Sequence, residues 1–463
     1  MFSYILLLVI ISLITYFNIK KYGFDILSPS LLYNLSMSAS IMCALIGLIS
    51  WNNEVNLSFV AIIIILTSVV SFNAGEIVIK KLVKKKEEKT SQKLFDGRKK
   101  ISTKEQPIEL WKIIVEIVYS IVVFVLVFCE IYRVAKSAGF TGGGLGSMIQ
   151  AYRSTSILFT TEYAAAGARI NIIVAQLQKI LEVMCYLNLY YLTNIVFEKK
   201  QKIICYIKKY WHNILIPLIA IATGLLTGSR MQTIIYFVFA AVVIIMKLGN
   251  KYDYVDLLKQ HWRKIIILLL IAISFFYVLL PLTGRKNHAN IVDYISFYFG
   301  ASIPSLNRFT NEPMEKPEVF GEETFRGIQT VLYKLKISKY IQPISKEWEL
   351  FYTNDNNRLA SNIYTSGKRY YFDFGLLGVV ILQMINGAVM TLLYYWAKSK
   401  KTIIPVMMFA MYAYMIIDQV RDEYLFSTFI HINTIFKFVV LYIGLKILNT
   451  QFTWRRKNEI KNG

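Results

Sequence analysis

Long apolar blocks alternate with short polar segments along almost the whole chain. Eleven blocks approach or exceed the length needed to cross a hydrocarbon core about 30 Å thick, which takes about 20 helical residues. Unpaired backbone groups are costly in lipid, so blocks of this length predict helices and not the alternating strands of about ten residues found in barrels. We therefore predict an all-α, polytopic membrane protein. The predicted spans are 2–19, 31–50, 57–79, 112–133, 170–197, 213–228, 231–248, 264–283, 370–396, 402–418 and 425–448.

The polar connections alternate between segments rich in Lys and Arg and segments poorer in them. The rich segments are 20–21, 80–112, 199–209, 247–264, 398–401 and 455–461. Cytoplasmic loops carry an excess of Lys and Arg, so this alternation predicts an outer N-terminus and a cytoplasmic C-terminus. It places residues 51–56, 134–169 and 284–369 on the outer face of the membrane.

The segment 284–369 is far longer than an ordinary helix connection and divides the chain into three parts. Residues 1–283 form the predicted N-terminal bundle of about eight helices, and residues 370–463 form the last helices with a basic cytoplasmic tail. The large loop is rich in aromatic residues, which argues against a solvated, disordered segment. We expect it to be ordered and to pack back onto the membrane surface.

The pair of spans around Pro217 and Thr227–Arg230 is irregular, because both spans are short and glycine interrupts the sequence between them. Broken or re-entrant helices have this pattern, and such backbone is tolerated at membrane depth only where it lines a protein cavity. A tight hairpin between two ordinary helices is the alternative.

Composition agrees with a membrane protein. Of 463 residues, 55% are hydrophobic and 17% are charged, with a formal net charge of +23. The basic residues cluster between apolar blocks, so they fit membrane lipids and topology better than nucleic acid. The four cysteines lack a CxxC spacing, and the four histidines lie far apart in the sequence. We therefore predict no metal site and no cofactor.

Arginines on the predicted outer face are unexpected, because the positive-inside rule concentrates Lys and Arg in cytoplasmic loops. A guanidinium group holds phosphate oxygens in a two-point fork and stays charged, so arginines beside a membrane cavity suit a diphosphate or another anionic headgroup. Interfacial anchoring to lipid phosphates is the alternative for any single arginine. The set comprises Arg153, Arg169, Arg230, Arg285, Arg308, Arg326, Arg358, Arg369 and Arg421.

Several acid/base candidates lie on the same predicted face. Imidazole titrates near neutral pH, so His288 near Arg285 is a candidate base for a sugar hydroxyl, and Asp293 is a second candidate. A histidine in a loop is also often simply solvated. The other candidates, which form no diagnostic spacing, are Glu322, Glu323, Asp355, Asp373, Asp418, Asp422 and Glu423.

Inside the predicted membrane region, Lys179 and Glu182 lie one helical turn apart and are expected to neutralise each other. Transport proteins use such pairs, and a purely structural ion pair explains this one equally well.

The chain resembles the Wzy-type oligosaccharide repeat-unit polymerases of bacterial O-antigen, capsule and exopolysaccharide assembly. The likeness lies in the layout of about eleven spans, one dominant outer loop and dispersed outer arginines. Three short stretches add to it: Leu226–Arg230 (LTGSR), Phe297–Leu306 (FYFGASIPSL) and Tyr370–Gly378 (YYFDFGLLG).

The resemblance implies an undecaprenyl-diphosphate-linked oligosaccharide donor, whose glycan is transferred to the terminal sugar of a new repeat unit, with no nucleotide sugar. It implies that Arg230, Arg285 and Arg369 bind the diphosphate, and Arg358 joins them as a further loop arginine. Tyr298 and Trp348 are candidates for stacking on sugar rings, although aromatic belts at membrane interfaces look alike. A chain-length regulator and a flippase are the implied protein partners.

Two other functions fit parts of the pattern. A glycan ligase uses the same donor with a different acceptor, and the sequence does not separate it from a polymerase. A lipid-linked oligosaccharide flippase or ion-coupled transporter predicts internal repeats and charged residues in the membrane interior, without an ordered outer loop.

Overall fold

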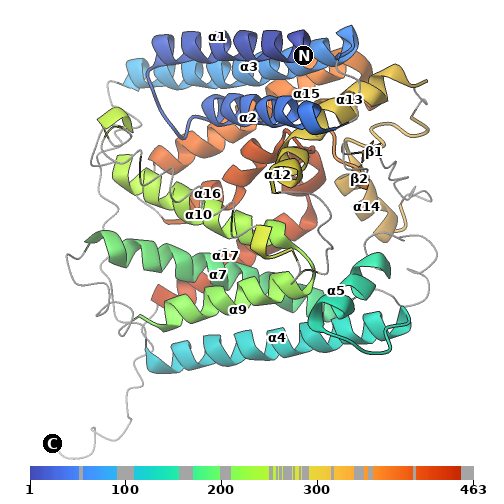
Figure 1. Cartoon of the computed structure of the whole chain (residues 1–463). Coiled ribbons are helices and arrows are strands. Elements are labelled where there is room, and N and C mark those ends of the chain that lie inside the picture. Colours follow the sequence, from blue (N-terminus) through green and yellow to red (C-terminus); the bar gives the residue numbers. More distant parts are fainter. Residues whose placement is uncertain are drawn as a thin grey trace, which may run out of the picture.

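A computed structural model describes residues 1–51, 56–90, 109–155, 170–198, 210–249, 291–313, 317–337, 349–352, 358–399 and 403–449, with a few positions between 254 and 283. The long helices run alongside one another in Figure 1 and form one bundle. They are α1 (Phe2–Tyr22), α2 (Pro29–Ser50), α3 (Phe59–Thr90), α4 (Leu110–Ser137), α7 (Ile172–Glu198), α9 (His212–Leu226), α10 (Arg230–Gly249), α15 (Ser366–Ser399), α16 (Ile403–Asp418) and α17 (Ile432–Asn449).

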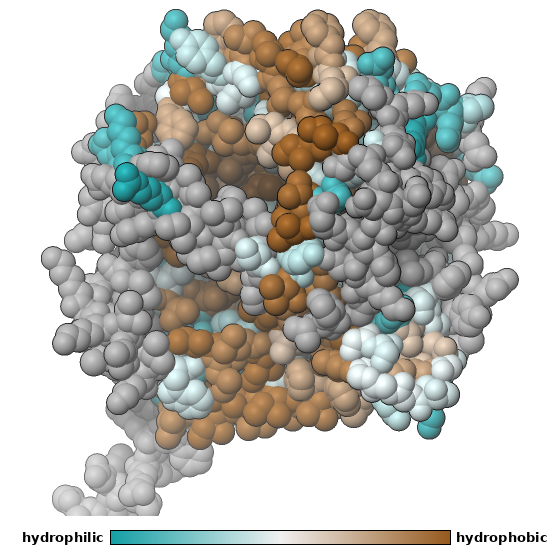
Figure 2. All heavy atoms as spheres, in the orientation of Figure 1, coloured by the Kyte–Doolittle hydropathy of each residue, from teal (hydrophilic) through white to brown (hydrophobic). Residues whose placement is uncertain are grey.

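The predicted all-α class is confirmed for the described residues. Seven helices are long and apolar enough to cross a membrane, namely α1, α2, α3, α4, α7, α10 and α15, while α9 and α16 are shorter apolar helices. Ten of the eleven predicted spans coincide with a helix, and most of residues 264–283 lies outside the described residues. Apolar side chains cover the outside of α1 and α4, as a lipid-facing surface requires, and they form brown areas along the upper and lower edges of Figure 2.

Basic side chains tie helix ends together at one end of the bundle, which we call the lysine end. There the ammonium group of Lys398 lies 2.6 Å from Asp25, and Lys112 donates a hydrogen bond of 2.8 Å to the carbonyl oxygen of Ile447. Lys247 donates to Thr193 over 3.0 Å. These contacts join the ends of α15, α17 and α10 to the start of α4, the end of α7 and the α1–α2 connection.

Shorter elements gather at the opposite end, toward the right of Figure 1. They are α5 (Leu145–Arg153), α12 (Ile291–Gly300), α13 (Ser302–Asn311), α14 (Arg326–Lys334), the π-helix η3 (Leu425–Phe429) and two antiparallel strands, β1 (Glu349–Tyr352) and β2 (Arg358–Ser361). Most of them belong to the predicted large loop. The described parts of that loop pack on the bundle itself: α12 lies along α2, and Asn307 of α13 accepts a 2.5 Å hydrogen bond from the Ser58 amide.

The irregular pair of predicted spans forms two helices joined by a tight turn. Gly228 has φ +72° in that turn, between the end of α9 and the start of α10. A residue with a side chain rarely adopts this conformation, so glycine permits the reversal that places Arg230 in the first turn of α10. The described backbone therefore has the hairpin form of the two alternatives.

The segment YYFDFGLLG contains a break that its apolar pattern does not predict. Gly375 has φ 63° and ψ −160°, which divides α15 into residues 366–374 and 376–399. A Cβ on Gly378 would lie 2.8 Å from the carbonyl oxygen of Tyr370, whereas eight residues of continuous helix rise about 12 Å. The first part of α15 therefore folds back beside the second.

Partly buried charges in the bundle pair differently from the sequence prediction. Glu182 forms its ion pair with Lys437 of α17 over 2.5 Å, and Lys179 donates to Asn433 over 2.7 Å. The predicted Lys179–Glu182 pair is therefore wrong, because α17 supplies a closer partner for each side chain. Both contacts join α7 to α17.

Glycine brings the backbones of α3 and α15 together. A Cβ on Gly75 would lie 2.1 Å from the carbonyl oxygen of Met384, and one on Gly387 would lie 2.2 Å from that of Phe72. Close approach at small residues is how helices associate in lipid, where apolar burial offers little preference.

We expect Gly75→Ala to force α3 and α15 apart and to lower the stability of the bundle by about 1–3 kcal/mol, as overpacking does. Thermal unfolding in detergent or nanodiscs measures the effect. Gly144→Ala is the matched control, since a Cβ there meets no atom within 4 Å. Equal unfolding temperatures for the two variants would contradict the packing argument.

We expect Lys437→Met to leave the Glu182 charge without its ion-pair partner and to destabilise the protein by about 2.5–3.5 kcal/mol. The double variant Glu182→Gln with Lys437→Met should recover most of this loss, because no buried charge remains. The same unfolding measurement tests it. A double variant as unstable as the sum of the two single variants would exclude direct coupling.

Candidate functional site

Arg230 begins α10 at the end of the bundle opposite the lysine end. The tight turn at Gly228 points it inward, and only 2% of its surface is exposed. Its Nη2 donates a hydrogen bond of 2.5 Å to the hydroxyl oxygen of Tyr294. A buried arginine that begins a span is thus tied to an aromatic residue of the large loop.

Helix α12 supplies two tyrosines to the same place. Tyr294 and Tyr298 lie one turn apart, and their rings stack with centroids 6.2 Å apart. The guanidinium carbon of Arg230 lies 5.6 Å from each ring centroid. These distances are within the range of cation–π attraction.

Arg421 reaches Tyr298 from the turn that follows α16. Its guanidinium carbon lies 4.5 Å from the Tyr298 ring centroid, and its Nη1 donates to Asp418 over 3.2 Å. Tyr424 also donates to Asp418. Burial alone would lower the pKa of Arg421, but Tyr298 and Asp418 beside it raise that pKa above the ordinary arginine value. Its Nε is buried and donates to no acceptor among the described residues.

Arg153, the last residue of α5, packs over the same turn as Arg230. A Cβ on Gly228 would lie 2.2 Å from its Cδ, so the glycine also makes room for this side chain. Its Nη1 donates to the carbonyl oxygen of Thr283 over 3.3 Å. We call Arg153, Arg230, Arg421, Tyr294 and Tyr298 the arginine–tyrosine cluster. Three positive charges and two aromatic rings thus converge from four segments distant in the sequence, a composition suited to an anionic ligand.

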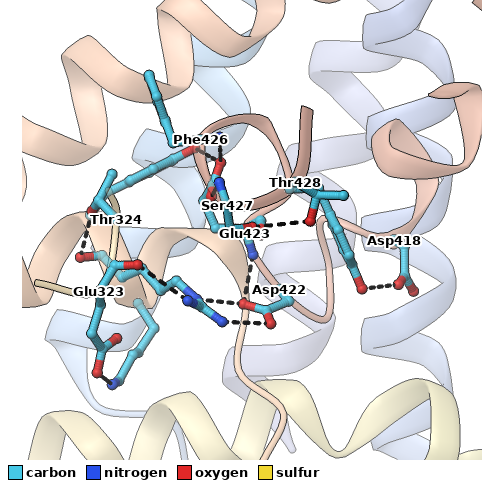
Figure 3. Close-up of polar contacts among 12 residues, drawn as sticks. Glu323, Thr324, Asp418, Asp422, Glu423, Phe426, Ser427 and Thr428 are labelled. Carbon is cyan, nitrogen blue, oxygen red and sulfur yellow. Dashed lines mark hydrogen bonds and ion pairs between the residues drawn. The ribbon is translucent and has the colours of Figure 1, made fainter. Parts of the chain in front are cut away.

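A second group, the Arg369–Asp422 network, adjoins this cluster through the turn after α16. Arg369 binds Asp422 with two parallel hydrogen bonds of 2.6 and 2.7 Å and donates to the carbonyl oxygen of Glu323 over 3.2 Å. Lys368 pairs with the Glu323 carboxylate. Figure 3 shows Asp422 and Glu423 side by side, with Asp418, the last residue of α16, farther to the right. The network joins the start of α15, the segment before α14 and the turn after α16.

Glu423 holds the backbone that follows. Its carboxylate accepts hydrogen bonds from the amides of Phe426 and Ser427, at 2.8 and 2.9 Å, and from the Tyr370 hydroxyl at 3.1 Å. Burial raises the pKa of Glu423, and the two amides oppose this shift because they favour the charged form. On the other side of the network, burial and the neighbouring Arg369 charge lower the pKa of Arg326 to about 10.

The structure brings together only some of the residues predicted from sequence. Arg230 and Tyr298 are in the arginine–tyrosine cluster. Asp293 precedes Tyr294 on α12 and is 4% exposed. Arg369 belongs to the neighbouring network, where Asp422 engages its fork. Arg358 lies in β2, with its backbone opposite that of Tyr352. Three further predicted residues, Arg285, His288 and Trp348, lie outside the described residues.

Several residues that the fold places in these groups were not singled out from the sequence. Arg421 stood in the wider arginine set, and Asp418, Asp422 and Glu423 stood among the acid/base candidates. The polar run Asp418–Glu423 (DQVRDE), directly after an apolar helix, was the available signal. Tyr294 carried no signal beyond its position one turn before Tyr298.

The chain was also compared with known proteins, and no family model, curated protein or solved structure matches it. Within the described part of the chain, no group of three or more His, Cys, Asp or Glu side chains could hold a metal ion. The described site consists of buried guanidinium groups, tyrosine rings and a neighbouring network of carboxylates.

Proposed function

We propose that this protein polymerises polyprenyl-diphosphate-linked oligosaccharide repeat units at the outer face of a bacterial cytoplasmic membrane. It would transfer the growing glycan from its lipid diphosphate carrier to the terminal sugar of a new unit. The observation that carries the proposal is the arginine–tyrosine cluster, in which three arginines and two tyrosines converge at the bundle end opposite the lysine end.

Charge asymmetry supports the outer location. The described lysines that border the Lys-rich segments, namely Lys112, Lys247 and Lys398, lie at the lysine end, which the positive-inside rule assigns to the cytoplasm. In an arrangement of eleven spans, with residues 264–283 as the eighth, both the large loop and the N-terminus lie outside. The arginine–tyrosine cluster then faces the side on which flipped lipid-linked oligosaccharides become available.

The donor chemistry matches the cluster. Guanidinium groups hold diphosphate oxygens in two-point contacts and stay charged, so they stabilise the negative charge that grows on the leaving diphosphate. The buried Nε of Arg421 is a donor still available for such an oxygen. Tyrosine rings beside the arginines provide apolar faces for sugar rings, with a hydroxyl group at the polar edge.

The transfer needs a base as well as charge stabilisation. The acceptor hydroxyl oxygen forms the new bond to the anomeric carbon, the bond from that carbon to the diphosphate oxygen breaks, and the hydroxyl proton goes to a base. Asp293, buried next to Tyr294 on α12, and His288 are the candidates for that base. Because the guanidinium group of Arg369 already donates two hydrogen bonds to Asp422, Arg369 would position the turn that carries Arg421.

We expect Arg421→Gln to lower polymerisation by about 100-fold or more, as the loss of one charge-stabilising donor does. Arg421→Lys should also be impaired, because an ammonium group keeps the charge but loses the fork. The measurement is the chain length of lipid-linked glycan extracted from the native host, with protein level checked by immunoblot. Arg133→Gln is the control, since Arg133 is exposed on α4 and pairs with Glu130.

The glycan that accumulates separates the rival functions. Single repeat units on a carrier accessible from outside would support a polymerase. Long chains that remain on the carrier, without transfer to their final acceptor, would identify a ligase, and units trapped on the cytoplasmic side would identify a flippase. Normal polymer in Arg421→Gln cells would remove Arg421 from the site and with it the observation that carries the proposal.

A further inference from the structure

A group of uncharged polar side chains is buried where α2, α3 and α15 meet. Seven residues, each at most 2% exposed, carry eight side-chain polar atoms that make no hydrogen bond within the described part of the chain. The atoms are Tyr33 Oη, Ser68 Oγ, Thr365 Oγ1, Ser366 Oγ, Gln383 Oε1, Asn386 Nδ2, Asn386 Oδ1 and Gln419 Nε2. We call these seven residues the amide–tyrosine cluster.

Contacts on the α2 side show that these residues are neighbours. The Tyr33 hydroxyl faces the side chains of Ser68, Ser366 and Gln383 without forming a hydrogen bond of good geometry. Gln383 donates to the side-chain oxygen of Gln419 over 2.7 Å, and the Ser366 amide donates to the Gln419 carbonyl oxygen over 2.9 Å. Each amide of the Gln383–Gln419 pair therefore keeps one polar atom unused.

On the other side, the cluster reaches the Arg369–Asp422 network. Asn386 lies one turn after Gln383 on α15, beside Tyr370. The Tyr370 hydroxyl donates to Glu423 over 3.1 Å. The unpaired amide of Asn386 thus stands between the Gln383–Gln419 pair and the hydroxyl that contacts Glu423.

The unpaired atoms define what could satisfy them. Two are amide nitrogens, which only donate, two are amide oxygens, which only accept, and four are hydroxyl groups, which do both. A cation would leave the nitrogens unsatisfied, and an anion would leave the amide oxygens unsatisfied. A neutral molecule that both donates and accepts fits the whole set, and it must be small because every residue of the cluster is closed to solvent. Water has these properties, and it commonly bridges buried polar groups.

The irregular backbone around the cluster also needs hydrogen-bond partners for its polar groups. Residues 362–365 precede α15 without regular structure, and the turn from Gln419 follows α16. Irregular backbone within a membrane bundle persists where it is enclosed by protein or lines water. Thr365, Ser366 and Gln419 of the cluster lie in or directly beside these two segments.

We propose that the amide–tyrosine cluster binds ordered water molecules that connect Tyr33 and the Gln383–Gln419 pair to Tyr370 and Glu423. The water gives the Glu423 carboxyl group a hydrogen-bonded route into the bundle that does not pass through the arginine–tyrosine cluster. This inference does not depend on the glycan chemistry proposed above.

Radiolytic hydroxyl-radical labelling of the full chain in nanodiscs tests the proposal, because radicals formed from bound water oxidise the side chains beside it. Tyr33 and Tyr370, both 0% exposed, should be labelled several-fold faster than Phe239 and Phe409, which are also 0% exposed. Each rate is normalised to that of the same residue in the unfolded chain. Labelling of both tyrosines at the rate of the phenylalanines would overturn the proposal.

A substitution gives a second test, because a dry cluster and a water-filled cluster predict opposite changes in unfolding temperature. If the cluster is dry, Asn386→Leu removes two unpaired polar atoms and should raise the unfolding temperature. With water bound, the same change removes two partners of that water, so we expect a lower unfolding temperature and slower labelling of Tyr370. Met390→Leu, one turn further along α15, is the control and should leave labelling unchanged. A stabilised Asn386→Leu variant would overturn the proposal even if Tyr33 is labelled.

Discussion

The arginine–tyrosine cluster and the amide–tyrosine cluster both depend on the geometry fixed by the two parallel hydrogen bonds between Arg369 and Asp422. Arg369 lies in the short first part of α15, and Asp422 lies in the turn that follows α16, 53 residues away. Joining these segments fixes the turn that carries Arg421 toward Tyr298 and Glu423 toward Tyr370. A two-point arginine–carboxylate pair restricts orientation as well as distance, which a lysine in the same place would not do.

A second constraint is the need to satisfy polar groups away from water. Along α3 and α15, glycine allows helix backbones to approach closely, so their amides remain paired within each helix. Where the backbone leaves helical geometry, the sequence supplies polar side chains: Glu423 accepts hydrogen bonds from two amides of η3, Ser366 begins α15, and Gln419 directly follows α16. Some of the buried polar residues therefore lie where helices are interrupted, and the arginine–tyrosine cluster and the amide–tyrosine cluster each include residues from such an interruption.

The sequence predicted the helices much better than the site. Apolar blocks of about 20 residues have few alternatives in lipid, so α1, α2, α3 and α4 were readily located. The break at Gly375 was hidden, because its apolar neighbours continue the helical pattern on both sides. Partner choice was equally hidden: Lys179 lies one turn from Glu182, yet Lys437, more than 250 residues later, makes the ion pair. Local spacing indicates which charges could meet, whereas helix packing decides which ones do.

The same distinction explains why Arg421 was harder to recognise than Arg230. Arg230 follows a turn that requires glycine, so its position at a helix start is visible in LTGSR, whereas Arg421 acquires its role only when the turn after α16 is held against α15 by Asp422. In that turn Arg421 directly precedes two carboxylates, and the fold separates them: Arg421 faces Tyr298 of α12, while Asp422 and Glu423 face α15. This separation lets positive charge accumulate beside Tyr298 without being fully neutralised by the adjacent carboxylates.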